Sequence, residues 1–108
     1  MGCVQLPACA LPRGAHDAAA GAWRATPTHS KMVQDALHFG FAVEAPAKTL
    51  PGPAGGDDAR SYVRVSAMVY NSAADFDALA DAVLRIAWDD VPGEPLQRLR
   101  VLPAPRVL

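Results

Sequence analysis

Arg64 is the residue whose type and position best suit it to bind a ligand. Residues 62–70 alternate between larger or polar side chains and an apolar set made of Val63, Val65, Ala67 and Val69. This pattern predicts a β-strand with one apolar face, and it places Arg64 on the opposite face. The planar guanidinium could bind a substrate carboxylate through two parallel hydrogen bonds. The alternative is an exposed strand arginine that pairs with a nearby aspartate.

The other reactive side chains lack the partners that catalysis requires. Ser66 has no evident histidine and acidic partner, which argues against a nucleophilic triad. The Gly-rich stretch 52–56 lacks the Gly-Lys-Ser/Thr ending of a phosphate-binding loop. Asp57 and Asp58 could suggest a cation site, but two carboxylates in a Gly-rich loop are expected to be solvated. Lys31 stands at a helix start without apolar surroundings, so we interpret it as a surface lysine.

The cysteines and histidines do not predict a metal site or a disulfide framework. Cys3 and Cys9 are the two cysteines, and the histidines are scattered at His16, His29 and His38. Zinc ligands occur at tighter spacing, and a disulfide framework needs more cysteines in an exported protein. Residues 1–7 lack the basic segment of a usual signal peptide. We therefore expect reduced cysteines in a cytoplasmic protein.

The composition indicates one small domain with a core of small side chains. The chain has 108 residues, of which 51% are hydrophobic, 6% are aromatic and 22 are alanine. A domain of this size buries only roughly 60% of its unfolded surface and is marginally stable without further support. The net charge of −1 argues against a generic electrostatic binder of nucleic acid or of a membrane surface. No apolar stretch approaches the roughly 20 residues that cross a bilayer.

The pattern predicts an α+β fold, a small sheet with helices packed on one face. A strand is expected over 1–6, and residues 10–29 read as a loop with a weak helical turn at 17–23. A helix over 31–39 follows, capped by Thr28 or Ser30 and ended by Gly40. A strand over 41–45 and a loop over 51–58 precede the strand at 62–70.

A second helix is expected after that strand. Ser72 and Asp75 have the spacing of a variant capping box. One helical stripe follows, made of Phe76, Leu79, Ala80, Val83 and Ile86. After Trp88 the periodicity is lost, and four prolines occur in the last twenty residues. We expect a domain over 1–88, with an irregular insertion at 8–29, and an extended or disordered Pro-rich tail over 89–108.

Residues 62–79 resemble the C-terminal signature of class V aminotransferase-like enzymes, especially the isopenicillin N epimerase and cysteine desulfurase branch. The segment reads Tyr-Val-Arg-Val-Ser-Ala-Met-Val-Tyr-Asn-Ser-Ala-Ala-Asp-Phe-Asp-Ala-Leu. In that family, a strand reading Arg-Ile/Val-Ser leads into Tyr-Asn and then into an acidic and apolar helix. The likeness covers residues 1–7 and 30–87.

The resemblance implies the C-terminal small domain of a fold-type I enzyme that uses pyridoxal phosphate. Arg64 corresponds to the strand arginine that holds the α-carboxylate of an amino-acid substrate, while Tyr70 and Asn71 match the motif in structural roles. In this family the cofactor binds a lysine of a large domain. That domain has no counterpart here, and Lys31 and Lys48 are not in the expected context. The resemblance thus implies a fragment that binds no cofactor and catalyses nothing alone. The expected partners are a companion chain, which would supply the missing domain, or a second copy of this chain in a homodimer.

The alternative is a stand-alone α+β protein-interaction module without catalysis. Its partner surface would be the sheet face that carries Tyr62, Met68 and Tyr70, because no large domain covers that face. A degenerate reading frame with a poorly folded product is a third interpretation.

Overall fold

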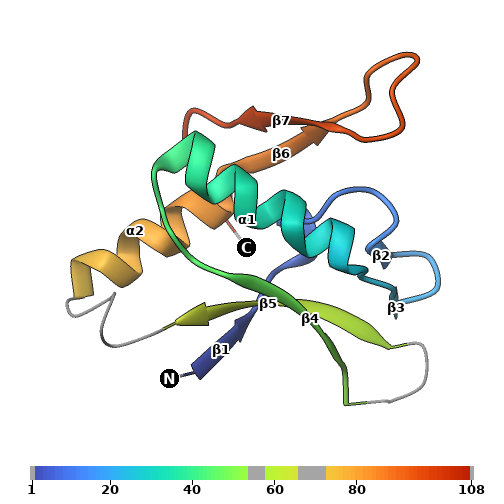
Figure 1. Cartoon of the computed structure of the whole chain (residues 1–108), viewed down its shortest axis with the longest axis horizontal. Helices are drawn as coiled ribbons and strands as arrows, with labels where there is room; N and C mark the ends of the chain where they lie inside the picture. Colours follow the sequence, from blue (N-terminus) through green and yellow to red (C-terminus); the bar gives the residue numbers. More distant parts are fainter. Residues whose placement is uncertain (1, 54–57, 66–72, 108) are drawn as a thin grey trace.

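The computed structural model describes residues 2–53, 58–65 and 73–107. Within them, three antiparallel strands form the main sheet in the order β1-β5-β4. These strands are β1 (Gly2–Gln5), β4 (Ala47–Pro51) and β5 (Ala59–Val65). The helices α1 (Pro27–Phe41) and α2 (Ala73–Leu84) lie on the same side of this sheet (Figure 1). The predicted α+β class, with helices on one face of a small sheet, is confirmed.

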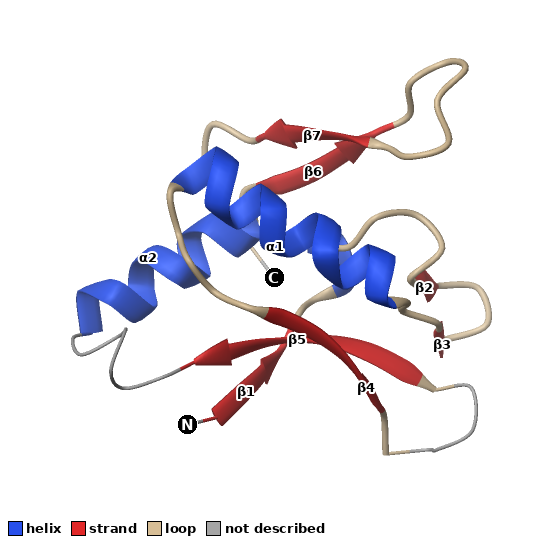
Figure 2. Ribbon diagram, in the orientation of Figure 1, coloured by secondary structure: helices blue, strands red, loops and turns tan. Residues whose placement is uncertain are grey.

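Smaller elements surround this framework. A single 3-10 turn, η1 (Ala8–Ala10), follows β1, and β2 (His16–Asp17) pairs with β3 (Ala22–Trp23). At the other end, β6 (Ile86–Asp89) and β7 (Arg98–Val101) form an antiparallel hairpin. Figure 2 shows this hairpin on the side of α1 that is turned away from the main sheet. Helix α1 therefore lies between the main sheet and the hairpin.

Helix α1 begins four residues before the predicted start at Lys31. Thr26 is the N-cap, and its side chain accepts a hydrogen bond from the His29 backbone N–H, so capping by Thr28 or Ser30 was wrong. Proline is tolerated in the first helical turn because its missing N–H has no intrahelical partner there, so Pro27 starts the helix. The predicted apolar face of Val33, Ala36 and Leu37 is confirmed, because all three side chains are buried.

The strand predicted for 41–45 is wrong. Phe41 is the last residue of α1, and Ala42 ends the helix in the left-handed conformation, with φ 54°. The Ala42 and Val43 N–H groups donate hydrogen bonds to carbonyls of the preceding helical turn. These N–H groups are therefore not free to pair with a neighbouring strand. Gly40 lies inside the helix, and its missing side chain leaves room for Leu99 of β7. Strand β4 begins only at Ala47.

Strand β5 confirms the prediction over 62–65 and begins earlier, at Ala59. It pairs with β4 across the loop predicted at 51–58, and with β1, which lies within the strand predicted at 1–6. The rest of the predicted strand, 66–70, and Ser72 of the predicted capping box lie outside the described residues.

The predicted second helix is present as α2, but it ends at Leu84. Ile86 belongs to β6 instead of the helical stripe, and within the stripe Leu79 and Val83 are buried whereas Phe76 and Ala80 are exposed. At this end, backbone carbonyls accept hydrogen bonds from distant residues instead of from a further helical turn. The Leu84 carbonyl accepts from the Arg106 N–H, at 3.0 Å, and the Arg85 carbonyl accepts from Leu102 N–H, at 2.8 Å.

The predicted Pro-rich tail over 89–108 is not confirmed: β7 lies within this segment and pairs with β6 along its whole length. Strand pairing is a long-range interaction, so the irregular pattern of the segment gave no sign of it. The hairpin is tied to the N-terminal region, where the indole N–H of Trp88 donates to the Ala10 carbonyl at 2.8 Å. The Arg106 guanidinium also donates to the Cys9 and Ile86 carbonyls.

The insertion at 8–29 contains a two-residue strand pair where a weak helical turn was expected. His16 lies opposite Trp23, and their rings are 4.2 Å apart. The Asp17 carboxylate accepts bonds from the N–H groups of Ala19 and Ala20, and so closes the turn between the strands. The turn is therefore fixed by a side-chain cap, and the apolar pattern of the segment does not reveal it.

The core is made of small side chains, as the composition predicts. Its largest fully buried apolar residues are Leu6, Leu37, Ile86, Val33 and Val63, and they are surrounded by alanines. Neither α1 nor α2 has the length and hydrophobicity that crossing a membrane would require. The fold therefore depends on a few aliphatic side chains, and two buried hydroxyls, Ser30 and Ser61, lie among them.

We predict that protonation of His29 destabilises the N-terminus of α1. The His29 Nδ1 atom accepts a bond from the Thr26 N–H at 3.1 Å, which only the unprotonated nitrogen can do. Burial lowers the pKa of His29 from its ordinary value of 6.5, and a backbone hydrogen bond to Arg13 partly opposes this shift. The stabilisation is therefore present above about pH 6.5 and is lost as the pH falls through the lower folded-state pKa.

Thermal melts of the wild type and of His29→Gln, in which glutamine keeps the capping box without titrating, measure this loss of stability. The wild type should lose more stability in acid, and equal losses would contradict the prediction.

We predict that Ser30→Ala destabilises the protein by about 1–3 kcal/mol, since it removes a buried hydroxyl from two partners. The Ser30 Oγ atom lies 2.6 Å from Thr49 Oγ1 and 2.8 Å from Ser61 Oγ, and thus links α1 to both β4 and β5. Urea unfolding measures the change. The control is Thr28→Ala, an exposed position in the same helical turn, which should change stability by less than about 0.5 kcal/mol. Equal losses of stability in both variants would contradict the stabilising role of this hydroxyl cluster, which is made of Ser30, Thr49 and Ser61.

Candidate functional site

The main sheet has one face under the helices and one open face. Ser61 and Val63 of β5 are buried beneath α1, so the alternate residues Arg60, Tyr62 and Arg64 project from the opposite face. In the part of the chain that the structure describes, neither helix covers that face (Figure 1). The sequence predicted that Arg64 projects from the face opposite the valines. The structure confirms this for Val63, which is buried on the other face.

Arg64 lies near the end of β5 and is partly buried. Its backbone N–H donates to the Pro46 carbonyl at 2.8 Å, just before β4 begins, and on the other side it lies opposite Cys3 of β1. The Arg64 backbone is therefore held on one side by β1 and on the other by the hydrogen bond to Pro46. A ligand-binding side chain on such a strand is better positioned than one on a loop.

Arg60 occupies the same face but is engaged within the protein. Its guanidinium bonds to the Asp58 carboxylate at 3.2 Å and to the Gln5 side chain at 3.3 Å, and it stands 5.2 Å from the ring centre of Trp23. Asp58 was expected to be solvated, and this expectation was wrong, since its side chain is only 12% exposed. A Cβ on Gly52 would overlap the Asp58 carboxylate, so a larger residue there would displace that side chain.

Sequence reasoning missed this cluster for an identifiable reason. Asp58 and Arg60 are two residues apart, so they share one face of a strand, and that spacing was a usable signal. Trp23 and Gln5 could not be assigned to it, because they come from distant segments. Asp57 lies outside the described residues.

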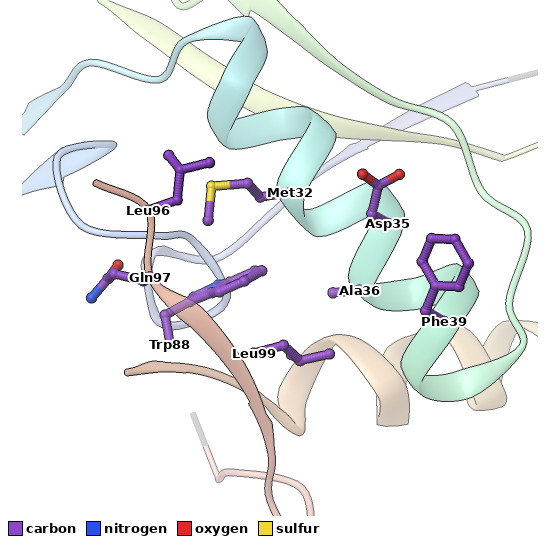
Figure 3. A pocket seen from close by; sticks show the side chains of 8 residues that line it. All are labelled: Met32, Asp35, Ala36, Phe39, Trp88, Leu96, Gln97 and Leu99. Atoms are coloured by element: carbon purple, nitrogen blue, oxygen red, sulfur yellow. The ribbon is translucent and has the colours of Figure 1, made fainter. Parts of the chain in front are cut away.

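A second feature is an apolar groove of about 310 Å³ between α1 and the β6–β7 hairpin. Figure 3 shows Met32 and Ala36 of α1 pointing toward the hairpin. The groove is lined on that side by Trp88, Leu96, Gln97 and Leu99, and on the helix by Met32, Asp35, Ala36 and Phe39. Phe39 is 80% exposed at its rim. Local sequence patterns do not indicate the groove, because one of its walls belongs to the segment predicted as a tail.

The remaining candidates do not gather into a site. Lys31 is on the exposed surface of α1, as predicted, and pairs with Asp35 at 2.8 Å. Lys48 is exposed on β4. Among the described residues, no group of three or more His, Cys, Asp or Glu side chains could hold a metal ion. Ser66, Met68, Tyr70 and Asn71 lie outside the described residues.

No family model matches this chain, and no curated protein or solved structure matches it either. The candidate site therefore stands on the open sheet face and on the sequence motif around Arg64.

We predict that Asp58 and Arg60 are energetically coupled by about 1–2 kcal/mol, because both side chains are mostly buried. The double-mutant cycle uses Asp58→Asn, Arg60→Gln and the combined variant, with the free energy of unfolding as the measurement. The matched control is the exposed pair Lys31 and Asp35, whose coupling should be near 0.3–0.5 kcal/mol. Coupling at Asp58 and Arg60 no larger than in the control would contradict the assignment.

Proposed function

We propose that this chain is the C-terminal small domain of a pyridoxal-phosphate-dependent enzyme of the class V aminotransferase or epimerase type, in which Arg64 binds the carboxylate of an amino-acid substrate. The observation that carries the proposal is the position of Arg64. It stands on the open face of β5, in the one segment that has the family motif, and that segment leads to helix α2. A companion chain supplies the rest of the active site, in the cytoplasm, and a homodimer of this chain is the alternative assembly.

The chemistry of arginine supports this role. A guanidinium presents parallel N–H donors in a plane and binds a carboxylate with two hydrogen bonds. Arg64 is partly buried, and its backbone is constrained by pairing with β1 and by the hydrogen bond to Pro46. Less conformational freedom is then lost when a ligand binds. Arg60 is less suited to the role, because it is already paired with Asp58.

The chain's own residues do not fit pyridoxal phosphate. When bound to an enzyme, this cofactor supplies an electron sink, and the protein must hold it in a shaped site through a lysine. Lys31 is ion-paired on an exposed helix surface, and Lys48 is exposed on a strand. Neither lines any pocket described for this chain. The role assigned to this chain is therefore limited to binding and orienting the carboxylate, with no step routed through the cofactor.

The apolar groove favours the second candidate function, a protein-interaction module. Phe39, Leu96 and Val101 are exposed apolar side chains at or near this groove. Exposed apolar groups that lie together are typical of contact surfaces. Such a surface is also compatible with the first proposal, because a small domain must contact the domain that it serves.

We predict that Arg64→Gln weakens binding of L-glutamine to the 108-residue chain by about tenfold or more, since hydrogen bonds to charged groups contribute about 1.5–3 kcal/mol. Chemical-shift titration by NMR measures the affinity. Arg64→Lys keeps the charge but loses the planar pair of donors, so it should restore only part of the affinity.

The cofactor prediction is tested separately. Pyridoxal phosphate added to the chain alone should produce no absorbance band from a lysine-bound cofactor. Such a band, or carboxylate binding that is unchanged in Arg64→Gln, would overturn the proposal.

A further inference from the structure

The open face of the main sheet presents a second cation beside Arg64. In the register, Lys48 of β4 lies opposite Tyr62 of β5, and directly opposite residues of antiparallel strands project to the same face. Arg64 is two residues beyond Tyr62, and its N–H bonds to the Pro46 carbonyl. Lys48 and Arg64 are therefore diagonal neighbours on one face, with backbones roughly 7–8 Å apart.

Among the residues that the structure describes, no acidic side chain lies directly opposite Arg64 or Tyr62 in the strand register. Cys3 lies opposite Arg64, and both Gln5 and Lys48 lie opposite Tyr62. The nearest cation along the same strand, Arg60, is already engaged by Asp58. This part of the face thus combines two positive charges with the phenol of Tyr62 between them. Opposite charge on a ligand would be attracted to both positions.

We propose that the ligand of this face carries two acidic groups, and that it is an α-amino dicarboxylic acid such as glutamate. This inference rests on the proposed function. Arg64 binds one carboxylate through its planar pair of donors, and the ammonium of Lys48 binds the second. The four-carbon stem of lysine is flexible enough to meet a carboxylate several ångströms from the one held by Arg64. Lys48 is then a specificity-determining residue.

The test compares two ligands that differ in one charged group. L-Glutamate and L-glutamine share the α-carboxylate and have nearly the same shape, but only glutamate has a second carboxylate. NMR titrations of the full chain should show that glutamate binds roughly two- to fivefold more tightly, which is the range expected for one exposed ion pair. Added salt should reduce this preference, because ions screen exposed charges.

Matched lysine variants test whether Lys48 causes the preference for glutamate over glutamine. Lys48→Met should make the two affinities equal, while Lys31→Met, the same change at the chain's other lysine, should leave the preference intact. Equal binding of glutamate and glutamine by the wild type would overturn this inference and leave the proposed function standing. Persistence of the preference in Lys48→Met would also overturn it. Absence of binding by both ligands would remove the proposed function and this inference together.

Discussion

The packing of α1 against the β4–β5 hairpin is the interaction on which the rest of this structure depends. Val33 and Leu37 of the helix are fully buried with Val63 of the sheet, and Ser30 forms hydrogen bonds to both strands. Hydroxyls buried away from water must find such partners, since an unsatisfied group would be costly. The hydroxyl cluster therefore adds a directional requirement to an otherwise non-directional apolar contact. The observed placement of α1 on the sheet satisfies both requirements.

The opposite side of α1 explains the C-terminal hairpin. A core made of alanine and a few aliphatic residues buries little surface, so the helix gains stability if a second layer covers it. The β6–β7 hairpin supplies that layer near Gly40, where the missing side chain allows Leu99 to approach closely. Trp88 and Arg106 fasten the hairpin to η1 through the carbonyls of Ala10 and Cys9. The hairpin covers this side of α1 only in part, and the apolar groove lies between the two.

In the described residues, this layered arrangement leaves one face of the main sheet uncovered by the helices. The helices and the hairpin lie on one side of the main sheet (Figure 2). Ser61 and Val63 of β5 are buried on that side, so the alternate residues Arg60 and Arg64 face away from the core. Arg60 and Arg64 stand on the same face in different settings. Arg60 forms an ion pair with Asp58, a hydrogen bond to the Gln5 side chain and a contact with the Trp23 ring. Arg64 lies opposite Cys3. That contrast is why the proposed function rests on Arg64 and not on the neighbouring arginine.

The sequence by itself determined the elements whose pattern is local. Alternation at 62–65 identified β5 and the face of Arg64, and the spacing of Val33, Ala36 and Leu37 identified the buried side of α1. These periodicities follow from the backbone geometry of strands and helices and need no distant partner.

Only the tertiary structure decided the ends of the elements and the contacts between segments. Ile86 left the helical stripe because the chain beyond Leu84 bonds to residues 102 and 106, and β7 formed because β6 lies beside it. The cluster at Arg60 and the diagonal pair of Lys48 and Arg64 likewise join separate strands. Their geometry is set by strand register, a long-range property that no single stretch of sequence contains.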